Sequence, residues 1–341
     1  MKDSLKIAIA GATGYIGLQL VKILSRHSKV KILYLCAGKS AGKSIYSFDK
    51  KINKRNLPKI SKVDKINWNM VDVLFTSLPN GEAQNIAKNL PNHVKLIDLS
   101  GDFRLDDYQM YKKWYDIDHK CKELINKSLY SITEFEKNNL KNYGIISCPG
   151  CYPTSVQIPL VPLIQNNVIK TENIIIDSKS GYSGAGKNIN KRFKHKNLYS
   201  SVMPYGVGGH RHVVEINQQL SKVAKKKINV IFTPHLIPMF RGILSTIYIE
   251  TRKNYTAKKI YEILKKYHKK NFFVRISKFN KPTGTGDIMN TNFCNISVCK
   301  DIKKNRVIII SAIDNLIKGG SGQAVQNMNV AFNLKETLGL I

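Results

Sequence analysis

The chain has 341 residues, of which 43% are hydrophobic and 23% charged, so it is long enough for about two domains with sizeable cores. It contains no run of the ~18–20 apolar residues that a membrane-spanning helix needs. Its six cysteines are too dispersed for a disulfide framework, and its first residues lack a signal-peptide pattern, which favours the cytosol and free thiols. The formal net charge of +32 would suit a nucleic-acid binder, but the lysines are scattered and no nucleic-acid-binding motif accompanies them. We therefore expect attraction to anionic small molecules, no specific nucleic-acid binding and no membrane partner.

The first part of the chain alternates short apolar runs with segments of helical periodicity. Strands are expected at residues 5–11, 31–38, 71–79, 94–100 and 143–150, and helices at 15–27 and 82–90. This alternation predicts βαβ units and an α/β domain with a doubly wound, parallel sheet of the Rossmann type.

After residue 154 strands become frequent and helices fewer. Strands are expected at residues 173–181, 228–238, 242–250, 272–277, 293–299 and 306–314, with a helix at 257–268. The pattern predicts a second, α+β domain on a mixed, largely antiparallel sheet. A closing helix at 322–334 is expected to return to the first domain, because chain termini often lie close together. The expected domains are thus residues 1–150, completed by about 315–341, and residues 151–314.

A glycine-rich turn, GATGYIG, lies between the first expected strand and the first expected helix. Glycines there permit a tight turn and close backbone approach, and a helix N-terminus binds a pyrophosphate. The candidate cofactor-binding residues of this turn are Gly11, Thr13, Gly14, Tyr15, Ile16 and Gly17. A tight turn without a ligand remains the alternative.

The end of the second expected strand bears on which dinucleotide binds. An NAD site usually has an acidic residue there for the ribose hydroxyls. Here the sequence is AGKSAGKS, which has no carboxylate and offers Lys39, Ser40, Lys43 and Ser44. Cations and hydroxyls suit a 2′-phosphate, so we expect NADP, with Ser40 and Lys43 among its ligands.

The stretch SCPGCYPT at residues 147–154 allows three interpretations of its two cysteines: a redox dithiol, half of a zinc site, or one nucleophile beside a bystander. A dithiol would be expected in a small thioredoxin-like unit, and zinc would have to recruit HRHVVE at residues 210–215 without a second C-x-x-C. We favour the nucleophile, and no metal, because Cys151 falls at a strand-to-helix turn. Backbone N–H groups and the helix dipole stabilise a thiolate there. Cys148 is expected to be buried in the turn.

Seven motifs in chain order resemble the N-acetyl-gamma-glutamyl-phosphate reductase family, the arginine-biosynthesis relative of aspartate-semialdehyde dehydrogenase. They are GATGYIG, DLSGDFRL (98–105), CPGCYPT (148–154), SKSGYSGAGK (178–187), GHRHVVEI (209–216), PHLIPMFRGI (234–243) and DNLIKGGSGQAVQN (314–327). The resemblance spans essentially the full length, and seven ordered motifs are far more specific than any one of them.

The resemblance implies a mechanism. The thiolate of Cys151 would attack the acyl phosphate of N-acetyl-L-glutamyl 5-phosphate, release inorganic phosphate and leave a thioester, which NADPH reduces to the semialdehyde. His212 would be the acid/base, since histidine titrates near neutral pH. Glu215 would orient its imidazole.

The same resemblance implies further contacts. Substrate-binding candidates are Arg104, Ser180, His210, His235 and Arg241. Cofactor-binding candidates beyond the first domain's turn are Ser183, Gly184, Asn315, Gly319 and Gln323. An ordinary salt bridge is the alternative for Arg104, His235 and Arg241, and a packing role is the alternative for His210. Relatives are dimers or tetramers, so a cytoplasmic homo-oligomer is expected.

Two positions depart from the family's pattern. Cys148 stands where asparagine is expected, which would weaken a hydrogen bond to a developing oxyanion or make the site sensitive to oxidation. Val214 stands where proline is expected. Aspartate-semialdehyde dehydrogenase and an aminoadipate-phosphate reductase of lysine biosynthesis remain alternatives, whereas a short-chain reductase would leave the cysteine and histidine motifs unexplained.

Overall fold

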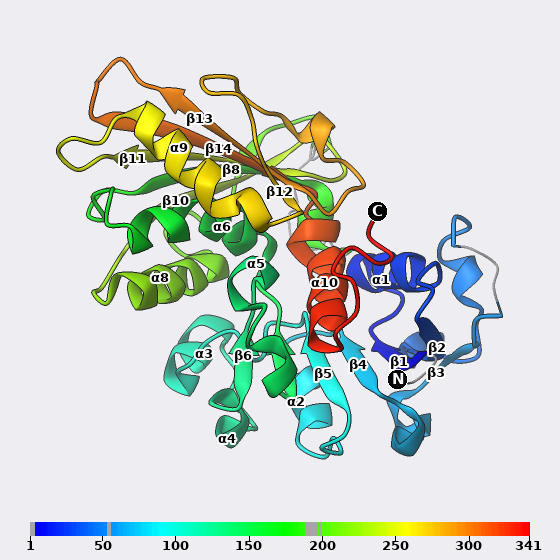
Figure 1. Cartoon of the computed structure of the whole chain (residues 1–341). Coiled ribbons are helices and arrows are strands. Elements are labelled where there is room, and N and C mark those ends of the chain that lie inside the picture. Colours follow the sequence, from blue (N-terminus) through cyan, green and yellow to red (C-terminus); the bar gives the residue numbers. More distant parts are fainter. Residues whose placement is uncertain (1–3, 53–55, 188–196, 198) are drawn as a thin grey trace. The chain divides into compact units, whose positions relative to one another are not determined.

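The computed structural model describes residues 4–52, 56–187, 197 and 199–341 (Figure 1). The chain forms two compact units, Met1–Pro149 with Gly320–Ile341, and Gly150–Gly319. Within the described residues, no helix combines the length and the apolar character needed to cross a bilayer.

The first unit is built on a parallel sheet with the strand order β3-β2-β1-β4-β5-β7-β6. Its strands are β1 (Leu5–Ala10), β2 (Val30–Cys36), β3 (Ile60–Ser61), β4 (Val73–Thr76), β5 (Lys95–Asp98), β6 (Ser128–Tyr130) and β7 (Ile145–Ser147). All pairings in it are parallel, which confirms the predicted Rossmann-type sheet. The central strand β4 is buried along its whole length, as expected of a strand covered on both faces.

The helices of this unit are α1 (Tyr15–Leu24), α2 (Glu82–Ala87), α3 (Tyr108–Tyr115), α4 (Lys122–Ile125), α5 (Thr133–Glu136) and α10 (Gly322–Ala331). The last of these, red in Figure 1, comes from the C-terminal segment and packs against α1 and α5. It is almost entirely buried although it is rich in asparagine and glutamine. Its amides are hydrogen-bonded: Asn327 Oδ1 accepts from Thr133 at 2.6 Å and from Ser131 at 3.0 Å.

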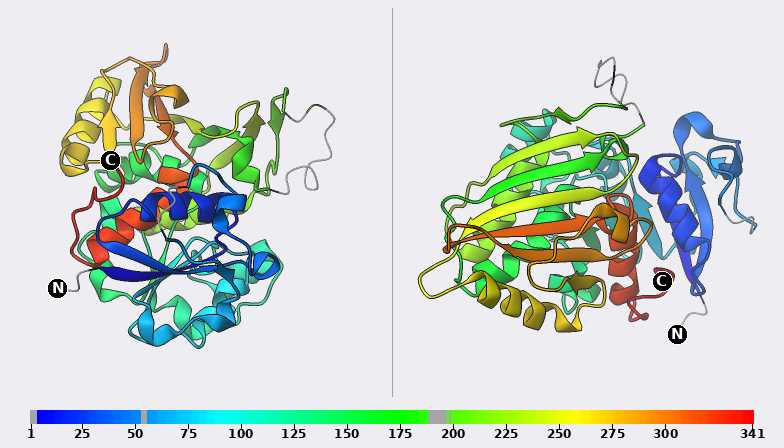
Figure 2. Two further views of the ribbon diagram at one scale, coloured as in Figure 1. Left: turned by 90° about the vertical axis from the view of Figure 1, so that its right-hand side faces the viewer. Right: turned by 90° about the horizontal axis from the view of Figure 1, so that it is seen from above.

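The second unit contains a mixed sheet with the order β12-β13-β14-β11-β8-β10-β9. Its strands are β8 (Ile175–Gly181), β9 (Met203–Pro204), β10 (Ile231–Ile237), β11 (Ile243–Glu250), β12 (Val274–Ile276), β13 (Cys294–Lys300) and β14 (Arg306–Ile313). The pairs β8–β10 and β12–β13 are parallel and the other pairings are antiparallel, as predicted. Figure 2 (right) shows these strands side by side.

The helices of the second unit are α6 (Cys151–Gln165), α8 (Arg211–Ala224) and α9 (Ala257–Tyr267). Helix α6 contacts β11, β14, α8 and α9, so it forms the centre of this unit's core. Burial alternates along β11, with one face buried and the other partly exposed. Such alternation is typical of an antiparallel sheet that is packed on one side.

Candidate active site

The glycine-rich turn of the first unit has the geometry of a dinucleotide cradle. Gly11 has φ +86°, and a Cβ there would lie 2.1 Å from the Ser77 carbonyl oxygen. A Cβ on Gly17 would lie 2.1 Å from the Gly11 carbonyl oxygen, so this glycine lets α1 pack closely on the turn. Gly14 is the N-cap of α1, with neither a capping side chain nor an acidic residue in the first turn. The helix N-terminus therefore suits an anionic pyrophosphate.

The loop that follows β2 lies beside this turn. The N–H groups of Gly11 and Ala12 both donate to the Cys36 carbonyl oxygen, at 2.9 and 3.1 Å, at the end of β2. Lys39 and Lys43 on the following loop are exposed, and residues 37–44 include no carboxylate. The other residues predicted to bind the cofactor in this turn and loop are partly exposed: Thr13, Gly14, Tyr15, Ile16 and Ser40.

Cys151 is the first residue of the 15-residue helix α6, and Gly150 is its N-cap. Cys151 forms no disulfide and is partly exposed. A thiol at the N-terminus of a long helix is close to its unsatisfied N–H groups and to the positive end of its dipole, which favour the thiolate. The predicted location at a strand-to-helix turn fits this geometry.

Cys148 is buried, whereas Cys151 is partly exposed. It is fully buried in the first unit, and burial raises the pKa of its thiol to about 12. Its sulfur accepts a weak hydrogen bond from Asn327 at 3.7 Å. Neither cysteine of the C-x-x-C forms a disulfide, and the burial expected for Cys148 is observed. The suggested sensitivity to oxidation therefore does not fit this thiol.

The imidazole of His212 lies against the turn that carries Cys151. A Cβ added to Gly150 would lie 2.4 Å from His212 Nε2 and within 2.8 Å of Cε1 and Cδ2. The ring also packs edge-on against His210 and Tyr152, with centroid separations of 4.9 and 5.8 Å. Because Gly150 has no side chain, the His212 imidazole can lie against the residue before Cys151.

His210 and Glu215 support this arrangement from α8. His210 is the N-cap of the helix, and its Nδ1 accepts a hydrogen bond from the His212 N–H at 3.1 Å. Glu215 is 1% exposed, and its Oε1 accepts from the Gly150 N–H at 2.8 Å. This bond ties the carboxylate to the turn that carries Cys151. The predicted role of Glu215 in orienting the His212 imidazole stays a prediction. Val214, the departure from the expected proline, is buried within α8.

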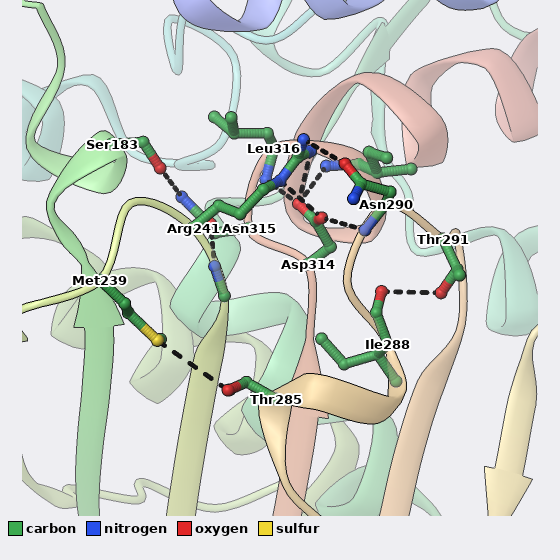
Figure 3. A network of polar contacts seen from close by, with 12 residues as sticks. Ser183, Met239, Arg241, Thr285, Ile288, Asn290, Thr291, Asp314, Asn315 and Leu316 are labelled. Atoms are coloured by element: carbon green, nitrogen blue, oxygen red, sulfur yellow. Dashed lines mark hydrogen bonds and ion pairs between the residues drawn. The ribbon is translucent and has the colours of Figure 1, made fainter.

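A second polar network lies around Arg241 in the same unit (Figure 3). Arg241 pairs with the buried carboxylate of Asp314, with Nε 2.7 Å from Oδ2 and Nη2 donating to Oδ1 at 2.9 Å. Asn315 Oδ1 accepts from the Gly242 N–H at 2.7 Å, and its Nδ2 donates to Ser183 Oγ at 3.0 Å. The predicted residues Arg241, Asn315 and Ser183 are therefore gathered in one network.

Other predicted residues of the second unit have local partners. A Cβ on Gly319 would lie 2.7 Å from Cys151 Cβ, so Gly319 packs directly against Cys151. Ser180 Oγ is buried, donates to the Gly181 carbonyl at 2.9 Å, and lies 2.7 Å from where a Gly184 Cβ would be. His235, on β10, has its Nδ1 3.1 Å from an Asp177 oxygen.

Two predicted residues belong to the first unit and are engaged there. Arg104 donates to the backbone carbonyls of Cys148 and Leu99, at 2.8 and 3.1 Å. Gln323 is 1% exposed and donates to Thr133 at 2.8 Å. Their predicted substrate and cofactor contacts stay predictions.

Gly150 and Asp314 were not among the residues predicted from the sequence. Both lie inside motifs already quoted, Gly150 between the two cysteines and Asp314 at the start of DNLIKGG. Their roles depend on which groups the fold places against them. The one feature of the sequence that could have identified them is that each is adjacent to a candidate residue. In the described part of the chain, no three side chains among His, Cys, Asp and Glu are grouped so that they could hold a metal ion.

Two family models match the chain. Residues 6–143 match the semialdehyde dehydrogenase NAD-binding domain, and residues 151–315 match the semialdehyde dehydrogenase dimerisation domain. The first match covers the glycine-rich cradle, and the second covers Cys151, His212 and the Arg241 network.

Full-length relatives share about two fifths of the sequence. The chain is 41% identical to a probable chloroplastic N-acetyl-gamma-glutamyl-phosphate reductase of Arabidopsis thaliana, with 100% of this chain and 85% of the relative covered. It is 42% identical to the N-acetyl-gamma-glutamyl-phosphate reductase of Thermoanaerobacter pseudethanolicus, over 98% and 97% of the two chains.

Solved structures show the same fold at low sequence identity. Aspartate semialdehyde dehydrogenase II of Vibrio cholerae, complexed with ASA, matches with a TM-score of 0.74 at 18% identity, over 97% of this chain and 98% of the other. Aspartate semialdehyde dehydrogenase with NADP from Candida albicans matches with a TM-score of 0.70 at 15% identity, over 96% and 98%. The two-unit α/β architecture is thus shared with these enzymes.

Proposed function

The chain belongs to the N-acetyl-gamma-glutamyl-phosphate reductase family, and we propose that it converts N-acetyl-L-glutamyl 5-phosphate to N-acetyl-L-glutamate 5-semialdehyde through a thioester on Cys151. The reaction consumes NADPH and a proton and releases NADP⁺ and inorganic phosphate, as a step of arginine biosynthesis. The observation that carries the proposal is the juxtaposition at Gly150: a partly exposed thiol begins α6, and the His212 imidazole lies over the residue before it.

In the first proposed step, Cys151 Sγ attacks the acyl carbon of the substrate, and the bond between that carbon and the phosphate oxygen breaks. His212 accepts the thiol proton and delivers it to the departing phosphate. The backbone N–H groups at the start of α6 stabilise the negative charge on sulfur. Glu215 supports the step by holding the Gly150 N–H at 2.8 Å.

In the second proposed step, the thioester carbon accepts a hydride, which a reduced nicotinamide supplies when it is bound. The resulting hemithioacetal oxyanion re-forms a C=O bond, the C–S bond breaks, and the semialdehyde leaves. His212, reprotonated from solvent, returns a proton to the Cys151 sulfur. A histidine is suited to both transfers because its pKa lies near neutral pH.

The cofactor we propose is NADP, with the pyrophosphate at the N-terminus of α1 and the 2′-phosphate on the loop after β2. The close approaches at Gly11 and Gly17 leave no room for side chains in the cradle. The exposed Lys39 and Lys43 would bind the 2′-phosphate, and the loop has no carboxylate to repel it.

We also propose a homo-oligomer that uses the partly exposed face of the second sheet. In register across five neighbouring strands, this face carries the apolar row Ile231, Ile175, Tyr248, Ile308 and Cys299. Ile231 is 58% exposed and Ile175 40% exposed. Apolar rows of this kind mark protein interfaces, and the matched dimerisation domain spans these strands. The cytoplasm is the compartment we propose, since none of the six cysteines, all of them among the described residues, forms a disulfide.

The proposed reaction is tested in reverse, as NADP⁺ reduction with N-acetyl-L-glutamate semialdehyde. We expect reduction only when phosphate is present, because phosphate must cleave the thioester. Cys151→Ser is expected to lower the rate at least ~10³-fold. Cys148→Ser, the matched control at the buried thiol, is expected to retain most activity.

Three results would contradict the proposal. Phosphate-independent reduction would indicate hydrolytic aldehyde oxidation. Faster turnover of aspartate semialdehyde or aminoadipate semialdehyde would assign the chain to a neighbouring pathway. Normal turnover by Cys151→Ser would exclude the thioester.

A further inference from the structure

The segment that packs against the nucleophile is organised by a buried carboxylate. Asp314 is fully buried, and its oxygens accept from the backbone N–H groups of Asn290, Leu316 and Ile317 at 2.8, 3.0 and 3.3 Å. Its own carbonyl accepts from the Gly319 N–H at 3.0 Å. Asp314 therefore shapes the short π-helical turn of residues 317–321, which contains Gly319.

Arg241 completes the bonding of this carboxylate (Figure 3). Two of its nitrogens face the two oxygens of Asp314 at 2.7 and 2.9 Å, and the third donates to Asn290 Oδ1 at 2.6 Å. The arginine side chain is 13% exposed and its partner carboxylate 0% exposed. A bidentate pair of this kind fixes geometry as well as charge, and lysine cannot reproduce it.

The turn then reaches the nucleophile through Gly319. A Cβ at this position would lie 2.7 Å from Cys151 Cβ and 3.2 Å from its Cα, so the two backbones are in close contact. Any shift of the 314–319 segment would move the surface on which Cys151 rests. All three nitrogens of the Arg241 guanidinium are engaged with Asp314 or Asn290, which points to a role through the protein.

We propose that Arg241 is a positioning residue, which acts through Asp314 to hold residues 314–319 against Cys151, and that it does not bind the substrate's carboxylate or phosphate. The proposal rests on the proposed role of Cys151 as the nucleophile. It replaces the substrate contact that the family resemblance implied for this arginine.

The test measures the thiol without substrate. Arg241→Lys and Asp314→Asn are made in a Cys299→Ser background, because Cys299 is the other partly exposed thiol among six and the remaining four are buried. In each variant we expect iodoacetamide to alkylate Cys151 about tenfold more slowly at pH 8, with kcat falling in parallel, as misplaced reacting groups predict. The KM for the acyl phosphate should change by less than ~3-fold, because no substrate contact is removed.

The two substitutions should also be non-additive, since both break one ion pair. Arg306→Lys is the matched control: it alters an ion pair with Asp301 on the surface of the same unit and should change neither alkylation nor kcat. Should Arg241→Lys fail to fold, Asn290→Ala, which removes one hydrogen bond of the network, carries the same comparison.

A rise in KM of tenfold or more with unchanged alkylation would show direct substrate binding and overturn the proposal. Unchanged alkylation, kcat and KM would overturn it equally. A protein without reductase activity would refute the proposed function. The alkylation rates would still test the role of Arg241, because alkylation needs no substrate.

Discussion

At the scale of single residues, the position of the His212 imidazole requires glycine at position 150. The His212 ring occupies the space that a Cβ at Gly150 would need, with Nε2 only 2.4 Å from that point. Gly150→Ala should therefore push the imidazole away from Cys151. We expect kcat to fall about 100-fold, the effect of displacing a catalytic group by roughly 1 Å. Steady-state kinetics of the purified variant measure it.

Gly144→Ala is the matched control, because a Cβ there would meet nothing within 4 Å. It should leave kcat unchanged. Both variants should unfold at nearly the wild-type temperature, since the Gly150 clash involves the end of one movable ring. Full activity in Gly150→Ala would show that the observed imidazole position is not the catalytic one.

The two neighbouring histidines can be told apart by their places on α8. His210 is the N-cap and accepts the His212 N–H, a task that asparagine also performs well. His210→Asn should thus retain kcat within severalfold. His212→Asn removes the proposed acid/base and should lower kcat about 10²–10⁴-fold, with loss of the limb of the pH–rate profile that the imidazole is expected to produce. The opposite ranking would assign the acid/base to His210.

The residues proposed to carry the chemistry are easier to predict from the sequence than the groups that surround them. Cys151 was predicted because a cysteine at a strand-to-helix turn has recognisable chemistry, whereas the choice of His212 depended on the family resemblance. The bond from the Gly150 N–H to Glu215 joins residues 65 positions apart, and the bond from Arg241 to Asp314 spans 73. Contacts at such separations are set by the packing of whole strands and helices, which no local pattern encodes.

At the scale of elements, a buried histidine links α10 to the segment that follows α1 within the first unit. His27 Nε2 lies 2.9 Å from Asn329 Oδ1 on α10. Burial lowers the pKa of His27 below its ordinary value, and the hydrogen bond with Asn329 opposes this only in part. Below ~pH 6.5 this histidine becomes protonated in the unfolded chain. In the folded chain its lower pKa delays protonation, so the unfolded state binds more protons. Stability from this group is complete above that pH and is lost as the pH falls through it.

The quantity to compare is the free energy of unfolding of the wild type minus that of His27→Gln. As the pH is lowered from ~6.5, we expect this difference to decrease by at most ~1.4 kcal/mol per pH unit. The difference isolates His27, since the pKa of buried His119 is also lowered and that of Asp98 raised in both proteins. Urea titrations between pH 5 and 8 measure it. A pH-independent difference would show that His27 is not held neutral.

The elements that the sequence predicted are those with strong apolar patterns. Strands such as β11 alternate cleanly, and α9 has one apolar face, so both were expected close to their observed bounds. Helix α3 was not expected, because its sequence YQMYKKWY buries only Tyr111. It forms because Asp107 caps its N-terminus and because the Tyr111 hydroxyl donates to buried Asp102 at 2.7 Å. Tertiary hydrogen bonds thus decide an element whose local pattern is weak.

At the scale of the whole molecule, the excess of cations is not neutralised. The chain has 55 Lys and Arg against 23 Asp and Glu, and the acidic groups of the proposed site, Glu215 and Asp314, are buried in hydrogen bonds. The surface potential is therefore positive, whatever bias of composition produced it. Such a field raises the local concentration of anions and falls with ionic strength.

The substrates proposed here are anions of different charge, so the field makes a graded prediction. Between 20 and 300 mM NaCl we expect kcat/KM for NADP⁺ to fall about tenfold, with a smaller fall for the singly charged semialdehyde and little change in kcat. The ordering follows because attraction to a field scales with ligand charge. In a Lys39→Gln/Lys43→Gln variant, most of the decrease of kcat/KM with salt should persist, because the remaining cations supply the field. Loss of this salt dependence would show that the whole effect comes from contacts of these two lysines. Equal slopes for the two ligands, or none, would show that the net charge plays no part in substrate capture.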